Sequence, residues 1–224
     1  MSVENTPSSR LVDALSRWSV TLGGESVAAL EQYCRALWDW NAKLNLTRHA
    51  DFDKFVTRDL VDSLALSEFI APGEHVLDVG SGGGVPGVVL AVLRDDIEVE
   101  LSESIGKKAR ALGDIVARLG LRLPVHHARA EAVLQRRRFD TLTIRAVARL
   151  RKLLEWFKPH WAHIGQLLVI KGPSWVEERG EARHHGLLRP LSLRKLKVYT
   201  TPDTGAQNVL LRIAPKHAAD AADE

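Results

Sequence analysis

The first 70 residues place apolar side chains at intervals of three to four, which is the spacing of amphipathic helices. The residues in this pattern are Leu11, Leu15 and Trp18, then Leu30, Cys34 and Leu37, and finally Phe52, Phe55, Val56, Leu60 and Leu64. Pro72 and Gly73 end the last segment, which runs from Asp51 to Ile70. We therefore expect two or three helices, as an N-terminal helical extension of residues 10–70.

From residue 71 onward, short apolar runs alternate with helical segments. Strands are predicted at 75–79, 97–102, 123–128, 139–144 and 166–171, with helices after the glycines near residue 80 and at 105–119, 150–162 and 174–184. Two more runs, 193–200 and 208–213, predict an edge hairpin that makes one strand antiparallel to the others. The pattern predicts an α/β fold with a mostly parallel, seven-stranded sheet and helices on both faces.

Length and composition fit this arrangement. The 224 residues suffice for one α/β domain, at 71–214, beside the extension, and we expect disorder only at 1–9 and 215–224. The single cysteine, Cys34, excludes an internal disulfide, and no apolar stretch has the length of a signal peptide or a membrane span. We expect a cytoplasmic monomer that does not associate with a membrane.

Basic residues cluster in the second half of the chain, although the net charge is only +3. Residues 1–70 hold 7 Lys and Arg against 10 Asp and Glu, whereas 129–152 hold 8 against two and 183–197 hold five against none. Clustered cations neutralise phosphates and release counterions, so the two basic segments indicate a polyanionic partner. For the run 136–138 alone, a solvated face is the favoured interpretation.

A glycine-rich loop directly follows the first predicted strand. The sequence from Val76 to Gly87 reads VLDVGSGGGVPG, with five glycines in eight residues, and glycine allows a backbone to approach a ligand closely. The dinucleotide pattern G-x-G-x-x-G, counted from Gly80, requires a glycine where Val85 stands, and is met only two residues later. The form D-x-G-x-G-x-G from Asp78 favours S-adenosylmethionine (SAM), which is cationic and lacks a pyrophosphate. An NAD(P) site and a purely structural turn are the alternatives.

Polar residues follow the other predicted strands, at the sheet edge where open α/β folds bind ligands. Glu103 follows the second strand, where a carboxylate would meet ribose hydroxyls, and residues 128–131 follow the third, where they would border the adenine. Arg145 ends the fourth strand, and a buried charge there needs a partner. The residues expected from this pattern to form the SAM site are Gly80, Gly82, Gly84, Glu103, Ala130, Glu131 and Arg145.

Neither a metal site nor a covalent nucleophile is predicted. The histidines at 126 and 127, 160 and 163, and 184 and 185 have no third ligand at matching spacing. The motif G-x-S-x-G is absent, and Cys34 lies on an apolar helical face where packing is its expected role.

Seven segments together resemble the RsmG (GidB) family of bacterial methyltransferases. They are WNAKLNLT at 40–47, RDLVDS at 58–63, LDVGSGGGVPG at 77–87, SIGKK at 104–108, ARAE at 128–131, IRA at 144–146 and IKG at 170–172. The resemblance implies a class I SAM-dependent methyltransferase fold, which is Rossmann-like. It also implies transfer of a methyl group to N7 of a guanine in 16S ribosomal RNA, at position 527 of that RNA. The expected partner is that RNA, as naked RNA, in the 30S subunit or in an assembly intermediate.

The resemblance also assigns individual residues. The family's SAM contacts fall on Gly80, Val85, Ala130, Glu131 and Arg145, and its functional polar positions on Asn45, Arg129 and Arg145. We expect Asn45, Arg58 and Arg129 to bind the substrate. Guanine N7 carries an in-plane lone pair and needs no general base, so the site must chiefly align the reacting atoms. An arginine that donates to O6 or a phosphate would hold this alignment, and Arg129 and Arg145 are the catalytic candidates.

Two positions depart from the family's usual motifs. Asp59 stands where R-H-I-x-D-S has histidine, and residues 205–208 read GAQN where the family has G-x-R-H. If position 59 faces the RNA, its carboxylate repels phosphate; alternatively, Asp59 pairs internally with Arg58 or Arg145. Two other functions stay open: a SAM methyltransferase that acts on a small molecule or a protein, and a catalytically silent RNA-binding relative.

Overall fold

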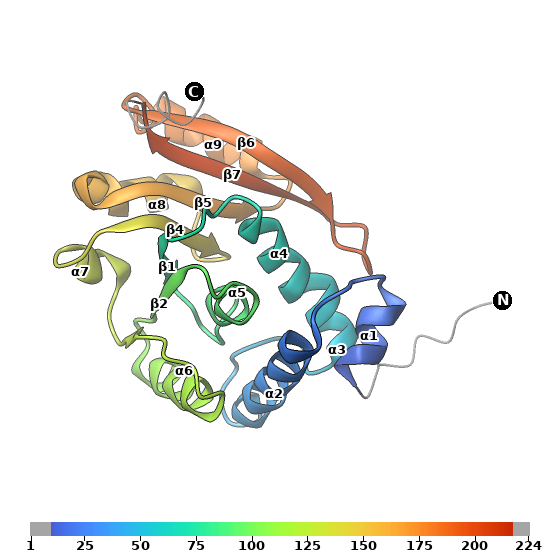
Figure 1. Cartoon of the computed structure of the whole chain (residues 1–224). Coiled ribbons are helices and arrows are strands. Elements are labelled where there is room, and N and C mark those ends of the chain that lie inside the picture. Colours follow the sequence, from blue (N-terminus) through green and yellow to red (C-terminus); the bar gives the residue numbers. More distant parts are fainter. Residues whose placement is uncertain (1–9, 217–224) are drawn as a thin grey trace.

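A seven-stranded sheet runs through the centre of the molecule (Figure 1). The computed structural model describes residues 10–216. The strands are β1 (His75–Val79), β2 (Glu98–Ser102), β3 (Val125–His126), β4 (Phe139–Arg145), β5 (Ile164–Lys171), β6 (Leu191–Thr200) and β7 (Gln207–Pro215). They lie in the order β3-β2-β1-β4-β5-β7-β6, and β7 alone runs antiparallel to its neighbours, β5 and β6. The predicted α/β fold, with its mostly parallel sheet and terminal hairpin, is confirmed.

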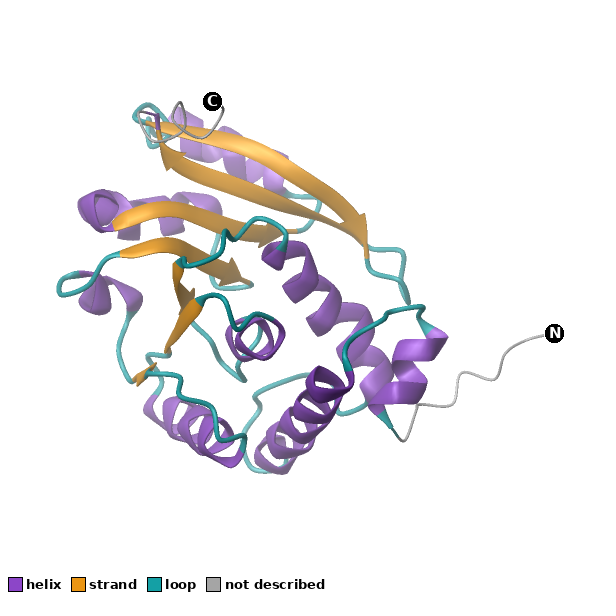
Figure 2. Ribbon diagram, in the orientation of Figure 1, coloured by secondary structure: helices purple, strands orange, loops and turns teal. Residues whose placement is uncertain are grey.

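Helices cover both faces of this sheet (Figure 2). They are α1 (Leu11–Arg17), α2 (Gly24–Asn41), α3 (Phe52–Lys54), the π-helical turn η1 (Phe55–Leu60), α4 (Val61–Ser67), α5 (Gly87–Leu93), α6 (Gly106–Arg118), α7 (Ala130–Leu134), α8 (Leu150–Phe157), the 3₁₀ helix η2 (Lys158–His163) and α9 (Trp175–His184). Successive strand residues point to opposite faces. Val76 therefore joins a core with α2, α4, α5 and α6, while Leu77 joins a second core with α7, α8 and α9.

The N-terminal extension shares the core of the first face. Leu30, Leu37 and Phe55 are buried in the same cluster as Leu90 of α5 and Leu101 of β2. This packing places the segment between α2 and α3, residues 42–51, beside the glycine loop that follows β1. The extension thus supplies one wall of the site described below. No helix among residues 10–216 is long and apolar enough to cross a membrane.

Several elements differ from the sequence-based prediction for local reasons. The predicted strand 123–128 contracts to β3, since Pro124 has no amide hydrogen to donate to a neighbouring strand. The helix predicted at 150–162 changes to η2 at Lys158, with Pro159 in its first turn. The segment 51–70 contains the π-helical turn η1, and α7 was not predicted. Strand β7 continues through Pro215, the first residue of the expected tail, and the expected disorder at 1–9 and 217–224 lies outside the described residues.

Candidate functional site

The glycine loop after β1 combines an open cradle with close packing. Gly80, Gly82 and Gly84 have φ angles of 67°, 57° and 107°, which favour glycine. A Cβ on Gly82 would meet only the Gly80 carbonyl, at 3.8 Å, so this position faces open space. A Cβ on Gly84 would instead meet Val88 Cγ2 at 2.7 Å. The glycine at 82 therefore leaves room for a ligand, whereas the one at 84 allows α5 to pack.

Carboxylates from two strands hold this loop in place. Glu103, which follows β2, is 5% exposed and accepts hydrogen bonds from the amides of Gly82 (3.0 Å) and Ile105 (2.7 Å). Asp78 in β1 accepts from the Gly87 amide (3.2 Å) and the Thr143 hydroxyl (3.0 Å). Burial raises the pKa of Asp78 to about 6, although these hydrogen bonds oppose the rise. The loop conformation thus depends on side chains of β1 and β4 and on Glu103, which follows β2.

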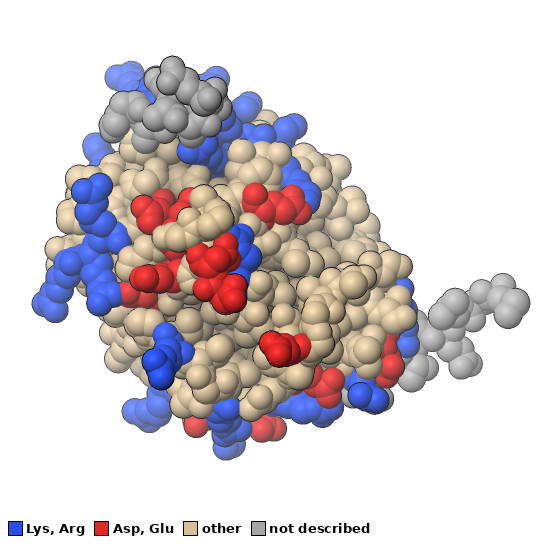
Figure 3. All heavy atoms as spheres, viewed as in Figure 1, with Lys and Arg blue, Asp and Glu red and all other residues tan. Residues whose placement is uncertain are grey.

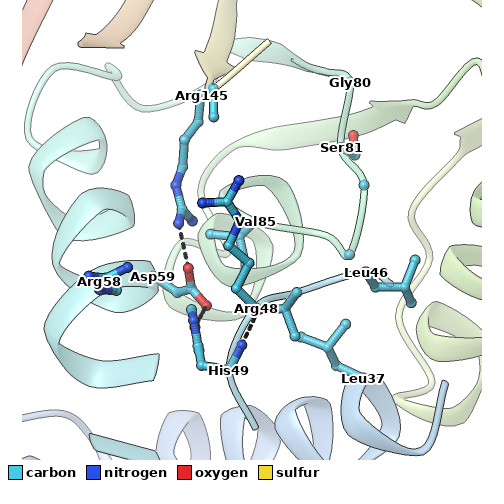
Figure 4. A pocket seen from close by; sticks show the side chains of 14 residues that line it. Leu37, Leu46, Arg48, His49, Arg58, Asp59, Gly80, Ser81, Val85 and Arg145 are labelled. Carbon is cyan, nitrogen blue, oxygen red and sulfur yellow. Dashed lines mark hydrogen bonds and ion pairs between the residues drawn. The ribbon is translucent and has the colours of Figure 1, made fainter. Parts of the chain in front are cut away.

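A pocket of about 480 Å³ opens beside this loop (Figure 4). The sheet side contributes Gly80, Ser81, Gly82, Val85, Arg145 and Ala146. The helical extension contributes Thr47, Arg48, His49, Arg58 and Asp59. The volume lies in the range of small-molecule sites. The pocket joins the loop at the carboxyl end of β1 to the end of β4, and it brings Gly80 and Arg145 together.

Arg145 enters the pocket from β4 between two carboxylates. Its Nη2 donates to Asp59 Oδ1 at 2.6 Å, and its Nε lies 2.9 Å from Asp62 Oδ2. Burial opposes the charge of Arg145, but the two carboxylates raise its pKa overall. Burial raises the pKa of Asp62, and Tyr199 donates its hydroxyl to this carboxylate at 2.6 Å. Arg145 is therefore held by two carboxylates and has the partners that its burial requires.

Asp59 pairs internally. It is 4% exposed, and its second oxygen lies 2.8 Å from His49 Nε2. Burial alone would raise the pKa of Asp59, but His49 and Arg145 hold it below its ordinary value. Of the two alternatives for this departure from the family motif, the geometry is that of an internal pair, with Arg145 as the partner. The 42–51 loop thus places the imidazole of His49 against Asp59, on the side opposite Arg145.

The turn after β4 is held in an uncommon conformation. Ala146 has a φ of 54°, a region that residues with a Cβ rarely occupy, and it lines the pocket. Lys171, at the end of β5, donates to the Ala148 carbonyl (2.5 Å) and lies 2.8 Å from Glu178. Glu178 in turn accepts from the Leu150 amide at 2.8 Å. The lysine of the segment IKG thus fixes the turn that follows Arg145.

Some residues predicted for the site lie outside the pocket. The side chain of Arg129 is 59% exposed, pairs with Glu131 at 3.1 Å and lies over the ring of Trp156. Ala130 is buried at the start of α7. The pocket lining does not include these residues, Glu103 or Gly84, although Glu103 contacts the loop at Gly82. Arg129 was a catalytic candidate, and the structure does not bring it together with Arg145.

Asn45 is exposed and does not line the pocket either. Asn41, the other asparagine of the segment WNAKLNLT, shapes the loop instead. Its Oδ1 accepts hydrogen bonds from the amides of Leu46 (2.8 Å) and Thr47 (2.9 Å). Such side-chain to backbone bonds replace helical ones where a helix ends, and α2 ends at Asn41. Of the residues predicted to bind substrate, Arg58 alone lines the pocket.

Sequence reasoning did not single out Arg48, His49 or Lys171 as site residues. Arg48 and His49 lie in a loop without hydrophobic periodicity, so no pattern placed them in the site. Their one signal was position, because they directly follow the NLT segment at 45–47. No group of three or more His, Cys, Asp or Glu within residues 10–216 is arranged to hold a metal ion.

Basic side chains lie along much of the rim of the face seen in Figure 3, with one group beside α7 and another near α9 and β6. The first includes the run 136–138, which is exposed. Arg137 of this run forms an ion pair with the buried Glu100, so the run is not wholly a solvated face. The second includes Arg183, Arg189, Arg194 and Lys195, which are also exposed.

Comparisons with known proteins identify the family of the chain. Residues 26–204 match the family model described as rRNA small subunit methyltransferase G (GidB). A ribosomal RNA small subunit methyltransferase G from Rhodopirellula baltica is 51% identical over 186 residues, which cover 83% of this chain and 80% of the relative. The enzyme of that name from Mycolicibacterium paratuberculosis is 35% identical over 71% of this chain and 66% of the relative.

Solved structures share the fold at low sequence identity. The O-methyltransferase from Bacillus cereus, solved in complex with SAH, has a TM-score of 0.60 and 16% identity, covering 91% of this chain and 97% of that chain. TrmK from M. capricolum, also solved with S-adenosylhomocysteine (SAH), has a TM-score of 0.54 and 13% identity over 69% of this chain and 68% of its own. These likenesses confirm the class I methyltransferase fold. From the family match and the identity to its relatives, the chain belongs to the ribosomal RNA small subunit methyltransferase G (RsmG) family.

Proposed function

We propose that this protein transfers a methyl group from SAM to N7 of a guanine in 16S ribosomal RNA, at position 527 of that RNA. One observation carries the proposal: a single pocket joins the glycine loop after β1 to Arg145 at the end of β4. The family supports the ribosomal RNA substrate, and the basic segments at 129–152 and 183–197 support a polyanionic partner.

The residues of the loop fit SAM. The open position at Gly82 would accommodate the ligand against the backbone, and the buried carboxylate of Glu103 is an acceptor for hydroxyl groups. The pocket residues that would hold SAM are Gly80, Gly82, Val85 and Arg145, and Glu103, Ala130 and Glu131 would contact it from outside the pocket lining. When bound, SAM supplies a methyl group attached to a positively charged sulfur. The lone pair of guanine N7 attacks the carbon of this methyl group, and the thioether departs.

The protein's own contribution is position and electrostatics. Arg145 is locked by Asp59 and Asp62, so it presents a guanidinium of fixed orientation to the pocket. No proton must leave N7, and the paired state of Asp59 and His49 agrees with a site that needs no general base. Gly84 packs α5 against the loop and Lys171 holds the turn after β4, so the two walls of the pocket are rigid.

Methyl transfer to ribosomal particles tests this proposal. Purified protein and radiolabelled SAM are incubated with 30S subunits that lack the modification, with naked 16S ribosomal RNA, and with ribosomal proteins alone. We expect label in the RNA, as 7-methylguanine at one position. Label in protein or in a small molecule would instead favour a SAM methyltransferase that acts on one of these substrates. SAM binding and RNA binding without transfer to any substrate would favour a catalytically silent relative.

A further inference from the structure

Arg48 differs from Arg145 in having no counterion. Both side chains line the pocket, and in Figure 4 Arg48 extends into it from the 42–51 loop. Arg145 is paired with two carboxylates, whereas Arg48 is exposed and forms no ion pair with any residue in the range 10–216. The nearby carboxylate of Asp59 is already engaged by His49 and Arg145. Arg48 therefore brings an uncompensated positive charge to the pocket.

The backbone that carries Arg48 is fixed on both sides. On one side, Asn41 Oδ1 accepts from the amides of Leu46 and Thr47, at 2.8 and 2.9 Å. On the other side, the His49 ring lies 2.8 Å from Asp59. An exposed arginine on a mobile loop would be an ordinary solvated charge. Here an unpaired arginine stands on a backbone that is anchored before and after it, so the fold sets the point at the pocket from which its side chain extends.

The position of Arg48 favours an anion that enters the pocket after the cofactor. The exposure of Arg48 places it at the mouth, and it comes from the extension rather than from the sheet. Enzymes that modify a base insert the base into the site, and its sugar and phosphate stay near the entrance. A charge at the mouth therefore meets the nucleic-acid backbone rather than the base.

We propose that Arg48 binds a backbone phosphate next to the target nucleotide and anchors it at the mouth of the pocket. This inference rests on the proposed function, because it takes RNA as the substrate. Arginine and lysine both bind phosphate, the arginine with a fork of donors and the lysine as a point charge. Contact with a phosphate predicts that lysine substitutes well for Arg48, whereas a bidentate contact to a base edge does not.

The test compares Arg48→Ala, Arg48→Lys and wild-type protein in single-turnover methylation of 30S subunits, together with SAM affinity by calorimetry. Arg122→Ala is the matched control, because Arg122 is exposed, lacks an ion pair within residues 10–216 and does not line the pocket. We expect Arg48→Ala to lower the single-turnover rate, at an enzyme concentration that does not saturate the 30S subunits, by about 10- to 100-fold. The SAM affinity of Arg48→Ala and the methylation rate of Arg122→Ala should equal the wild-type values. Arg48→Lys should recover most of the rate.

Salt dependence gives a second readout. Loss of one phosphate contact should make the slope of log affinity for RNA against log salt shallower by about 0.7 to 0.9 in Arg48→Ala. If Arg48→Ala weakens SAM binding and excess SAM restores the rate, Arg48 contacts the cofactor's carboxylate and the inference is overturned. An unchanged rate in Arg48→Ala, or an equal loss of rate in Arg122→Ala, would also overturn it. A wild-type protein that methylates no RNA overturns the proposed function itself, so the two failures are distinguishable.

Discussion

Arg145 and Asp59 form an ion pair of 2.6 Å, although 86 residues separate them in the chain. The pair joins the end of β4 to the π-helical turn η1, and it therefore joins the sheet to the helical extension. Both side chains line the pocket, so one interaction serves the fold and the site together.

The first prediction concerns the loss of Asp59. Asp59→Ala should lower the free energy of unfolding by about 3 kcal/mol, because it removes the buried carboxylate of an ion pair and leaves the partly buried guanidinium of Arg145 with Asp62 alone. Asp39→Ala is the control: Asp39 pairs with Arg118 at 3.2 Å but is 70% exposed, so its loss should cost less than about 1 kcal/mol. Urea denaturation measures the change in the free energy of unfolding for both variants. Unchanged stability together with tighter RNA binding would instead place Asp59 on the RNA surface.

The sheet was predictable from sequence because its signals are local. Each strand is a short apolar run, and the loop after β1 is marked by its glycines, so Gly80, Gly82 and the end of β4 at Arg145 could be placed without coordinates. The function of the two asparagines in the segment WNAKLNLT, Asn41 and Asn45, was not predictable in the same way. Asn41 rather than Asn45 bonds the loop, because α2 ends at residue 41, and helix ends are the least determined part of such a pattern.

The remaining site residues depend on contacts between distant segments. The partner of Asp59 is set by η1, a π-helical turn that hydrophobic spacing does not reveal. His49 and Arg48 gain their roles only when the extension packs beside the glycine loop. Arg129 shows the converse: its place after a strand was correctly inferred, but its side chain turns to Glu131 and Trp156.

The second prediction tests the cradle at Gly82. Gly82→Leu should abolish SAM binding, because the side chain would occupy the open space beside the loop. Gly120→Leu is the control, since Gly120 also has a positive φ (67°) and nothing within 4 Å of a Cβ, so the backbone strain is matched. Calorimetry should show binding to the control alone. Retained SAM affinity in Gly82→Leu would remove this position from the cofactor site.

The third prediction concerns pH and Asp78. The pKa of Asp78 is raised to about 6 in the folded protein, above its value of 3.8 in an unfolded chain, so the folded state takes up a proton first as the pH falls. Relative to Asp78→Asn, the wild-type protein should therefore gain about 1 kcal/mol of stability between about pH 7.5 and about pH 5.

The comparison with Asp78→Asn cancels the titration of other groups, such as Asp59 and Glu100, whose lowered pKa values act in the opposite direction. Urea denaturation of both proteins at several pH values gives the difference. A difference that stays constant across this range would show that Asp78 keeps an ordinary pKa.

The last prediction compares Arg145 and Arg129, the two arginines that the sequence indicated as catalytic candidates. Arg145→Ala should depress methyl transfer strongly, since a misplacement of about 1 Å can cost about a hundredfold in rate. It should also lower stability, because the carboxylates of Asp59 and Asp62 lose their cation. Arg129→Ala removes an exposed side chain outside the pocket and should leave stability within about 0.5 kcal/mol.

Arg145→Lys distinguishes charge from geometry in this prediction. A lysine keeps one positive charge but lacks the fork that reaches Asp59 with one nitrogen and Asp62 with another. We expect it to recover part of the stability and little of the rate. Single-turnover methylation at two salt concentrations measures the rate, and urea denaturation measures the stability. Near-normal transfer by Arg145→Ala would exclude Arg145 from the reaction, and a salt-dependent loss confined to Arg129→Ala would return Arg129 to the RNA-binding surface.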